Sequence, residues 1–171
     1  MVEYLKDKFI ISTDKSKLDI SAIHQFLSTQ AYWAMNRPLE VVQKSIENSM
    51  CFGVYDGQRQ VGLARVVTDF ATFAWLCDVF IIPEYRGLGL SKWLVECAIN
   101  APEVSNVRRF LLATRDASEL YAKYGGFEPL RNPERWMERI NPNLTDSDYL
   151  KKPAKQASDS NPTNHTQQAS R

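Results

Sequence analysis

The stretch DVFIIPEYRGLGLSKWL, residues 78–94, decides how the rest of the sequence is interpreted. It begins inside an apolar run, Phe73–Ile82, that contains a single acid, Asp78. Continuous apolar character of this kind is typical of a strand buried on both faces. Residues 83–87 break the run, and the apolar residues from Leu90 to Ile99 then recur with helical spacing. The stretch therefore predicts a buried strand, a glycine-containing loop and a helix in succession.

The residues before this stretch predict two helices and a hairpin. Asp56-Gly57 is typical of a hairpin turn, because both turn positions favour residues that tolerate a positive φ. Pro38 suits the start of a helix, where its missing N–H would have no intrahelical partner. The elements expected on this side are a strand at Lys8–Ser12, helices at Leu18–Gln30 and Pro38–Asn48, and strands at Cys51–Tyr55 and Gln60–Thr68.

The residues after the stretch predict a strand, a short helix and a final pair of strands. Asp116 is expected to cap the helix, with Glu119 three residues later completing a capping box. Gly125-Gly126 should end that helix. Trp136, like Trp75 earlier in the chain, is expected in the core. The elements expected here are a strand at Arg109–Thr114, a helix at Asp116–Tyr124, and strands at Phe127–Leu130 and Trp136–Ile140.

The element order predicts one α/β domain with helices on the faces of a mixed sheet. A chain of 171 residues is long enough for one domain with a substantial core. We place this domain at residues 1–145. Residues 146–171 are expected to form a polar, disordered tail, because residues 153–171 lack aromatic side chains and are rich in Ser, Asn, Gln and Thr.

Composition argues against several functional classes. Lys and Arg total 21 and Asp and Glu total 20, a net charge of +1, so no bulk electrostatic surface for nucleic acid or membranes is indicated. Cys51, Cys77 and Cys97 lie in apolar surroundings, which is typical of reduced thiols buried in the core of a cytoplasmic protein. The only histidines are His24 and His165, and without a spaced Cys/His cluster no metal site is expected.

The loop Arg86–Ser91 joins the buried strand to the helix and is a candidate anion site. Glycine permits a positive φ and lets a ligand approach the backbone, and the first N–H groups of a helix have no intrahelical partners. Together with the helix dipole and the charge of Arg86, these groups suit a phosphate or diphosphate. A tight turn that binds nothing would have the same sequence. The loop lacks the Gly-Lys-Ser/Thr of a Walker loop and the third glycine of a dinucleotide fingerprint.

The stretch 78–94 resembles the acyl-CoA signature of the GNAT superfamily of N-acetyltransferases. That family has Arg/Gln-x-x-Gly-x-Gly/Ala after an apolar strand; Arg86 and Gly89 match this pattern, and Ser91 replaces the usual Gly or Ala. Downstream, Leu120-Tyr121 and Gly126-Phe127 resemble the family's Leu-Tyr-x-x-x-Gly-Phe with one extra glycine. Two motifs in the right order are more specific than either alone, and the resemblance covers about residues 5–140.

The resemblance implies a GNAT-like α/β fold, with a central mixed, mostly antiparallel splayed sheet of about six to seven strands and about four flanking helices. It also implies acetyl-CoA as co-substrate and no metal. The pantetheine arm would pair with the strand backbone, which requires the sheet to splay apart beside Arg109–Thr114, and the loop amides would hold the pyrophosphate. The residues carried over are Val79, Phe80 and Ile81 for the arm, and Arg86, Gly87, Leu88, Gly89, Leu90 and Ser91 for the pyrophosphate.

The resemblance assigns Tyr121 as the general acid that protonates the departing CoA thiolate, a task that a positioned phenol can perform. A tyrosine that simply packs in the core is the alternative. Asp78 is a candidate general base, since the family often uses a carboxylate on this strand acting through water, and an alkylamine must lose a proton before it attacks. Equally, Asp78 can be structural, bonded to backbone or to an arginine such as Arg115.

The acceptor is expected to be a primary amine on a small molecule, an amino acid or a peptide. Tyr32, Trp33 and Arg37 lie in an aromatic connector between the two N-terminal helices and are candidates for lining the acceptor cleft. The alternative is that these rings only cover the edge of the sheet. A non-catalytic acyl-CoA-binding regulatory domain is the alternative to an enzyme. The oligomeric state is open, and a homodimer is one option.

Overall fold

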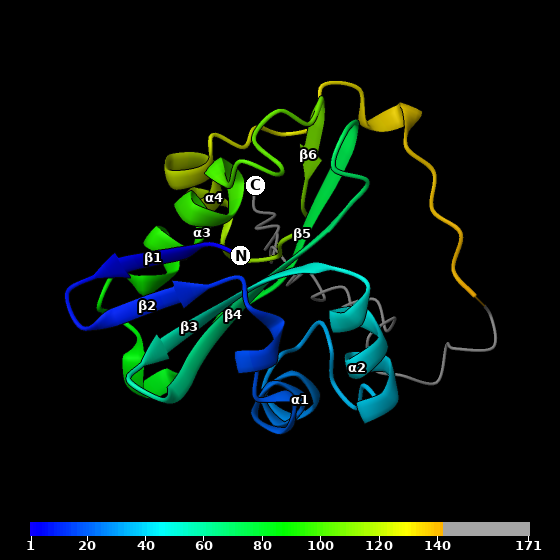
Figure 1. The fold of residues 1–171 in the computed structure, drawn as a ribbon. Coiled ribbons are helices and arrows are strands. Elements are labelled where there is room, and N and C mark those ends of the chain that lie inside the picture. Colours follow the sequence, from blue (N-terminus) through cyan, green and yellow to red (C-terminus); the bar gives the residue numbers. More distant parts are fainter. Residues whose placement is uncertain (142–171) are drawn as a thin grey trace, which may run out of the picture.

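A single six-stranded sheet forms the centre of the molecule, with strand order β1-β2-β3-β4-β5-β6 (Figure 1). The computed structural model describes residues 1–141, so the tail expected at 146–171 lies outside the described residues. The strands are β1 (Glu3–Lys6), β2 (Phe9–Ser12), β3 (Met50–Asp56), β4 (Arg59–Thr68), β5 (Phe73–Ile81) and β6 (Arg109–Leu111). A mixed and mostly antiparallel sheet, as expected from the sequence, is confirmed.

The sheet splays apart between its last two strands. Strands β1 to β5 pair antiparallel, and only β5 and β6 are parallel. The parallel register covers only Phe73 to Trp75 on β5. Strand β5 then continues to Ile81 with no β6 partner among residues 1–141. The splay required by the family resemblance is therefore present, and it leaves one edge of β5 open.

Strand β5 carries a bulge at Asp78. The pairing with β4 shifts its register between Leu63 and Arg65, so that Asp78 and Val79 together lie opposite one residue of β4. Asp78 adopts a positive φ of 49°, which is uncommon for a residue other than glycine. A bulge bends its strand and changes the direction of a side chain. Here it turns the Asp78 carboxylate toward the segment between the first two helices.

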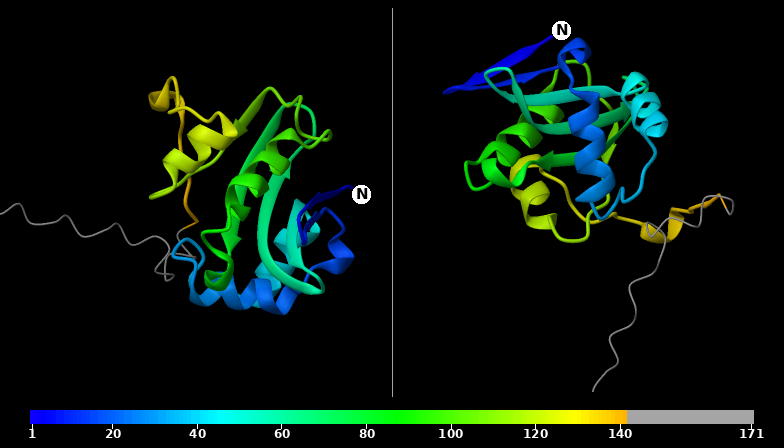
Figure 2. Two further views of the ribbon diagram at one scale, coloured as in Figure 1. Left: turned by 90° about the vertical axis from the view of Figure 1, so that its left-hand side faces the viewer. Right: turned by 90° about the horizontal axis from the view of Figure 1, so that it is seen from below.

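Helices cover both faces of the sheet (Figure 2). On one face the first two helices pack against Cys51, Leu63 and Phe80, and on the other face the third helix packs against residues such as Phe52 and Val66. No helix in residues 1–141 has the length and apolar character needed to cross a membrane. The helices are α1 (Ile20–Thr29), α2 (Leu39–Glu47), α3 (Leu90–Asn100) and α4 (Ser118–Gly125).

Local chemistry sets the helix ends. Helix α1 begins after Asp19, whose carboxylate accepts the N–H of Ala22 at 2.9 Å, a typical N-cap contact. Helix α3 begins after Gly89, which has a φ of 76°, in the left-handed region that favours glycine. Helix α4 ends at Gly125 and is followed by Gly126, which is also left-handed with a φ of 65°. The helix expected to start at Leu90 and the stop expected at Gly125-Gly126 are confirmed.

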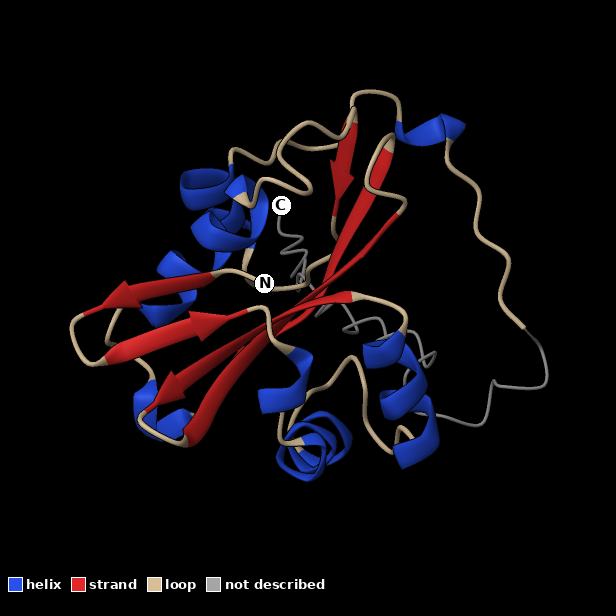
Figure 3. Ribbon diagram, in the orientation of Figure 1, coloured by secondary structure: helices blue, strands red, loops and turns tan. Residues whose placement is uncertain are grey.

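The chain after α4 differs from the sequence prediction (Figure 3). The strands predicted at Phe127–Leu130 and Trp136–Ile140 are absent, and these residues form loops around one 3-10 turn, Pro133–Arg135. Pro129 has no N–H to give to a ladder, which explains why the first of these segments does not pair. Trp136, predicted in the core, is 40% exposed, and the Arg109 guanidinium lies 5.0 Å from the centre of its ring.

Two further features, strand β1 and the start of α4, also differ from the sequence prediction. Strand β1 was not foreseen, because its residues are mostly exposed and show no apolar run. The capping box at Asp116 is wrong: α4 begins two residues later, after Ala117, with no side-chain cap. Asp116 instead forms an ion pair of 3.2 Å with Arg115, and the N–H of Ala117 donates to Thr114 Oγ1 at 3.0 Å.

Candidate active site

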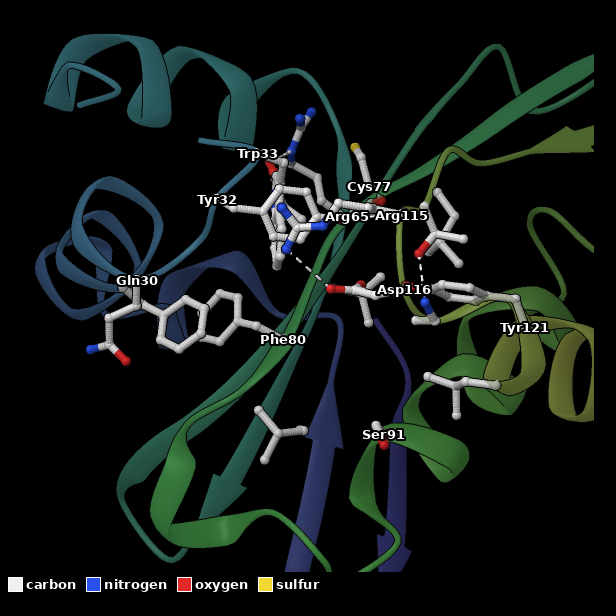
Figure 4. A pocket seen from close by; sticks show the side chains of 18 of the residues that line it. Gln30, Tyr32, Trp33, Arg65, Cys77, Phe80, Ser91, Arg115, Asp116 and Tyr121 are labelled. Carbon is white, nitrogen blue, oxygen red and sulfur yellow. Dashed lines mark hydrogen bonds and ion pairs between the residues drawn. The ribbon is translucent and has the colours of Figure 1, made fainter. Parts of the chain in front are cut away.

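A cleft of about 820 Å³ lies where β5 and β6 part. Its walls come from segments far apart in the sequence: the end of α1 with the α1–α2 connector, strands β4 and β5, the loop that leads into α3, and α4 with the loop before it. Figure 4 shows Tyr32, Trp33 and Arg65 on one side of this cleft, Tyr121 on the helix opposite, and Ser91 toward its lower end. Nearly all of the residues that the sequence nominated therefore lie around one cavity.

The loop from Arg86 to Ser91 forms one end of the cleft. Gly87 and Gly89 have φ values of 79° and 76°, and a Cβ added at either would meet nothing within 4 Å. Glycine is therefore required here by backbone conformation and not by lack of space. The loop leads into α3 without a side-chain cap, so the first N–H groups of this helix remain available for an anion. Arg86 Nε donates to the carbonyl of Ile81 at 3.1 Å, which ties the loop to the end of β5.

The open edge of β5 forms the floor. Val79, Phe80 and Ile81 all line the cleft, and beyond Trp75 their backbone has no β6 partner in the described chain. The Phe80 side chain points away from this edge and stacks on Phe26 of α1 with ring centroids 4.0 Å apart. Backbone N–H and C=O groups, and not the Phe80 ring, are thus what β5 can offer to a ligand lying beside it.

Tyr121 lies on α4 and faces β5 across the cleft. Its side chain is half-buried and packs edge-on against Phe127, with centroids 6.2 Å apart. Burial raises the pKa of Tyr121 to about 12, and the nearby Tyr32 and Asp116 add to this shift. The phenol is therefore protonated at neutral pH and is in the form required of a proton donor.

Asp78 is the centre of a buried polar cluster. Its Oδ1 accepts from Trp33 Nε1 at 3.1 Å, and Arg37 Nη1 donates to both carboxylate oxygens, at 3.1 and 2.9 Å. Arg65 Nε donates to Oδ2 at 2.8 Å, and Arg65 Nη1 reaches Ser49 Oγ at 2.8 Å. The structural alternative considered for Asp78 named Arg115 as a partner; the partners are instead Arg37 and Arg65.

The two arginines determine the charge state of Asp78. Burial alone would raise the pKa of this carboxyl, but the charges of Arg65 and Arg37 and the hydrogen bonds that they donate hold it below its usual value. The carboxylate is thus ionised and fully engaged by cations at neutral pH. Its contacts also fix the α1–α2 connector, which carries Trp33 and Arg37, against strand β5.

A second contact joins the two walls of the cleft. The Arg115 guanidinium lies 3.5 Å from the centre of the Tyr32 ring, and the Arg115 backbone N–H donates to Tyr32 Oη at 3.2 Å. Tyr32 also packs edge-on against Trp33, with centroids 5.0 Å apart. Tyr32, Trp33 and Arg37 all line the cleft. Their role in binding the acceptor stays a prediction.

Several cleft residues were not foreseen. Arg65 was missed although the sequence holds a signal for it, since it is the single cation in the strand predicted at Gln60–Thr68, which pairs with the strand that carries Asp78. Cys77 was assigned to the core but is half-buried and lines the cleft. Burial raises the pKa of its thiol to about 12, so it is a poor nucleophile at neutral pH.

Comparison with known proteins identifies the family. Residues 20–127 match the acetyltransferase (GNAT) family. A relative from Gibberella zeae, provisionally named an acetyltransferase, is 30% identical over 148 residues, covering 75% of this chain and 84% of the relative. A crystal structure from Xanthomonas campestris pv. campestris, provisionally described as a GNAT acetyltransferase, has 48% identity and a TM-score of 0.77, and covers 81% of this chain and 97% of that one.

A third similarity concerns the fold alone. A Clostridium acetobutylicum structure, described as an acetyltransferase with acetyl-CoA, has 15% identity and a TM-score of 0.59, and covers 77% of this chain and 96% of that one. The family match includes the strand, the glycine loop and the helix that surround the cleft. Because that match spans more than half of the chain, the protein belongs to the GNAT family of acetyltransferases.

Proposed function

We propose that this acetyltransferase moves an acetyl group from acetyl-CoA to a primary amine by direct attack of the amine on the thioester. The observation that supports this most is the open edge of β5. It runs from the Arg86 loop, which suits a diphosphate, to the region faced by the protonated phenol of Tyr121. A ligand with a phosphate end, an amide-bearing arm and a reactive thioester matches these three features in order.

Acetyl-CoA would be held mainly by backbone groups. Its pantetheine arm carries amides that can pair with the N–H and C=O groups of Val79 to Ile81, like an added strand. Its pyrophosphate would meet the amides of residues 86–91 and the charge of Arg86. The Clostridium acetobutylicum structure with the same fold was solved with acetyl-CoA, which supports this choice of donor.

The proposed reaction forms one bond and breaks one. The amine nitrogen bonds to the acetyl carbonyl carbon, the carbon–sulfur bond breaks, and its electron pair leaves on sulfur. Tyr121 donates its phenolic proton to the CoA thiolate. The proton that the amine loses returns to the phenolate through water, so the products are the N-acetyl compound and free CoA. No cysteine takes part, in keeping with the raised pKa of Cys77.

For Asp78, the contacts support a structural role more than that of a general base. Its oxygens accept hydrogen bonds from Trp33, Arg37 and Arg65, and its pKa is lowered, so it has little tendency to take up a proton near neutrality. We propose that Asp78 positions the acceptor side of the cleft. A base acting through water is the competing role, and the Asp78→Asn variant separates the two roles.

We also propose residues 1–145 as the catalytic domain and the cytoplasm as its location. The assignment of the domain is supported by the two apolar cores, whose buried residues span Phe9 to Val104. A variant ending at residue 145 should keep the turnover of the full chain. Loss of turnover would mean that residues 146–171 contribute to the site.

The activity itself is tested by acetyl-CoA-dependent thiol release across amines, amino acids and short peptides. Blanks without acceptor are needed, because Cys77 lines the cleft and can react with the thiol reagent. Turnover with any amine supports the enzyme. Tight acetyl-CoA binding without turnover on any acceptor would instead support a non-catalytic acyl-CoA-binding regulatory domain.

The proposed binding of the CoA pyrophosphate by the loop at residues 86–91 is tested by Arg86→Glu. Charge reversal should raise the Kd for acetyl-CoA at least about 30-fold, because a charge-assisted contact to the pyrophosphate is replaced by repulsion. Isothermal titration calorimetry measures this directly. The matched control is Arg139→Glu, since Arg139 is exposed and does not line the cleft. An Arg86→Glu variant with normal affinity would contradict the assignment of this loop.

A further inference from the structure

The charges of the side chains that line the cleft do not sum to zero. Four arginines and two aspartates line it. Arg115 pairs with Asp116 at 3.2 Å where both side chains are well exposed, so this pair is neutral and solvated. Arg86 belongs to the loop at the far end. Arg37 and Arg65 remain, and they share one carboxylate, that of Asp78.

This buried group carries one positive charge in excess. The side chains of Arg37 and Arg65 are only 17% and 12% exposed, and that of Asp78 is 2% exposed. A net charge held out of bulk water is costly unless a counter-ion completes it. The other partners of the group are Trp33 and Ser49, and neither is charged. No other acid lines the cleft near it within residues 1–141.

The two guanidinium groups also have donors to spare. Arg37 uses only Nη1 in its bonds to Asp78, which leaves Nε and Nη2 without an acceptor in the described chain. Arg65 uses Nε and Nη1, which leaves Nη2. Neither arginine has a fully buried nitrogen that lacks a partner, so these donors keep some exposure, and both side chains line the cleft. Arginine donors in such a setting suit a planar carboxylate.

The position of this group excludes the phosphates of CoA as its counter-ion. Asp78 precedes Val79 on β5, whereas the Arg86 loop follows Ile81. Strand geometry puts Asp78 about 10 Å before Ile81, and the loop lies farther still. The arginine pair is therefore at the thioester end of the proposed acyl-CoA path, where the acceptor must enter.

We infer that the acceptor is an amine that also carries a carboxylate, an amino acid in the simplest case, and that Arg37 and Arg65 bind this carboxylate. The inference rests on the proposed acetyl transfer and names the substrate class of the same cleft. The excess positive charge also disfavours a protonated amine nearby, so it promotes the neutral, nucleophilic form. Polyamines and lysine side chains, which bring only positive charge, are poor acceptors on this reading.

The test compares each L-amino acid with its own carboxamide and with the amine that lacks the carboxyl group. The carboxamide keeps the shape and removes the charge. We expect at least one amino acid whose kcat/KM exceeds that of its carboxamide at least about 30-fold, or about 2 kcal/mol at 1.36 kcal/mol per factor of ten. Because the amine of a carboxamide is less protonated, any bias runs against this result. Carboxamides or plain amines that react equally well would overturn the inference.

Variants of Arg37 and Arg65 test whether these two side chains bind the carboxylate of the acceptor. Arg37→Gln and Arg65→Gln each leave one arginine paired with Asp78 and remove the excess charge. We expect each to lower the ratio of acid to carboxamide at least about tenfold. Because both substrates are compared on the same variant, a general loss of activity cancels from this ratio. Arg139→Gln removes the same charge from an exposed position outside the cleft and should leave the ratio unchanged. An unchanged ratio in both arginine variants would place the carboxylate elsewhere and overturn the assignment.

A binding measurement separates this inference from the proposed function. Protein saturated with CoA is titrated with N-acetyl-L-phenylalanine and with its carboxamide, following the fluorescence of Trp33 and the other tryptophans; other N-acetyl amino acids follow in the same way. Tighter binding of the acids supports the carboxylate site. Equal binding, or binding of neither form across the series, overturns it. Selective binding of the acids without turnover of any amine would keep the site and discard acetyl transfer.

Discussion

Replacing Tyr121 by phenylalanine should lower kcat at least about 100-fold while the KM for acetyl-CoA stays nearly constant. The phenol of Tyr121 faces β5 across the cleft, and the thiolate needs its proton only as the carbon–sulfur bond breaks. The hydroxyl makes no hydrogen bond to another described residue, so its removal should not disturb folding. Steady-state kinetics with the best acceptor, together with a thermal melt, measures both effects.

The control for this variant is Tyr124→Phe on the same helix. Tyr124 is half-buried and packs near Lys92, but it does not line the cleft. Its loss should leave kcat within about twofold of wild type. Because the pKa of Tyr121 is about 12, the rate should not fall on the alkaline side until the pH approaches that value. A Tyr121→Phe enzyme with normal kcat would remove Tyr121 from the mechanism.

Asp78→Asn should destabilise the protein by about 3 kcal/mol, because it leaves two buried guanidinium groups without their shared carboxylate. For a domain of this size that loss corresponds to a fall in Tm of about 6–12 °C. Chemical denaturation and calorimetry at pH 7 provide the measurement. Asp116→Asn is the matched control, since the exposed pair with Arg115 should contribute less than about 1 kcal/mol.

The pH dependence of the unfolding free energy tests the stabilising role of Asp78 in a second way. The folded pKa of Asp78 lies below its value of about 3.9 in an unfolded chain. Its contribution to stability is therefore fully present above pH 4 and is lost as the pH falls through the folded pKa. The difference in stability between wild type and Asp78→Asn should shrink in that acid range. A variant that stays stable but loses kcat would instead support Asp78 as the general base.

The sequence predicted the part of the fold in which local signals agree. The apolar run ending at Ile82, the glycines of the loop and the helical spacing after Leu90 all fall within residues 73–100, so each supports the next. The prediction of the two final strands failed because their local signals do not agree. Phe127–Leu130 and Trp136–Ile140 show an apolar pattern, but strand formation needs a partner, and the missing N–H of Pro129 weighs against one.

The partners of Asp78 could not be predicted from local sequence patterns. The sequence marked it as the only acid of a buried strand, yet its partners Arg65 and Arg37 lie 13 and 41 residues away. The β4–β5 register and the bulge at Asp78 bring Arg65 and Asp78 together, and the packing of the α1–α2 connector against β5 adds Arg37. The contact between Tyr32 and Arg115 spans 83 residues and is likewise set by tertiary structure.

The open edge of β5 has a consequence for solubility. An unpaired strand edge can recruit a strand from another molecule and so start aggregation. In this protein the edge lies inside a cleft whose two walls are joined by the contact between Tyr32 and Arg115, so a slender ligand can reach it while a whole polypeptide strand meets a barrier. Preparations stored without CoA should therefore aggregate faster than those stored with it, and removing the contact between Tyr32 and Arg115 should speed the aggregation.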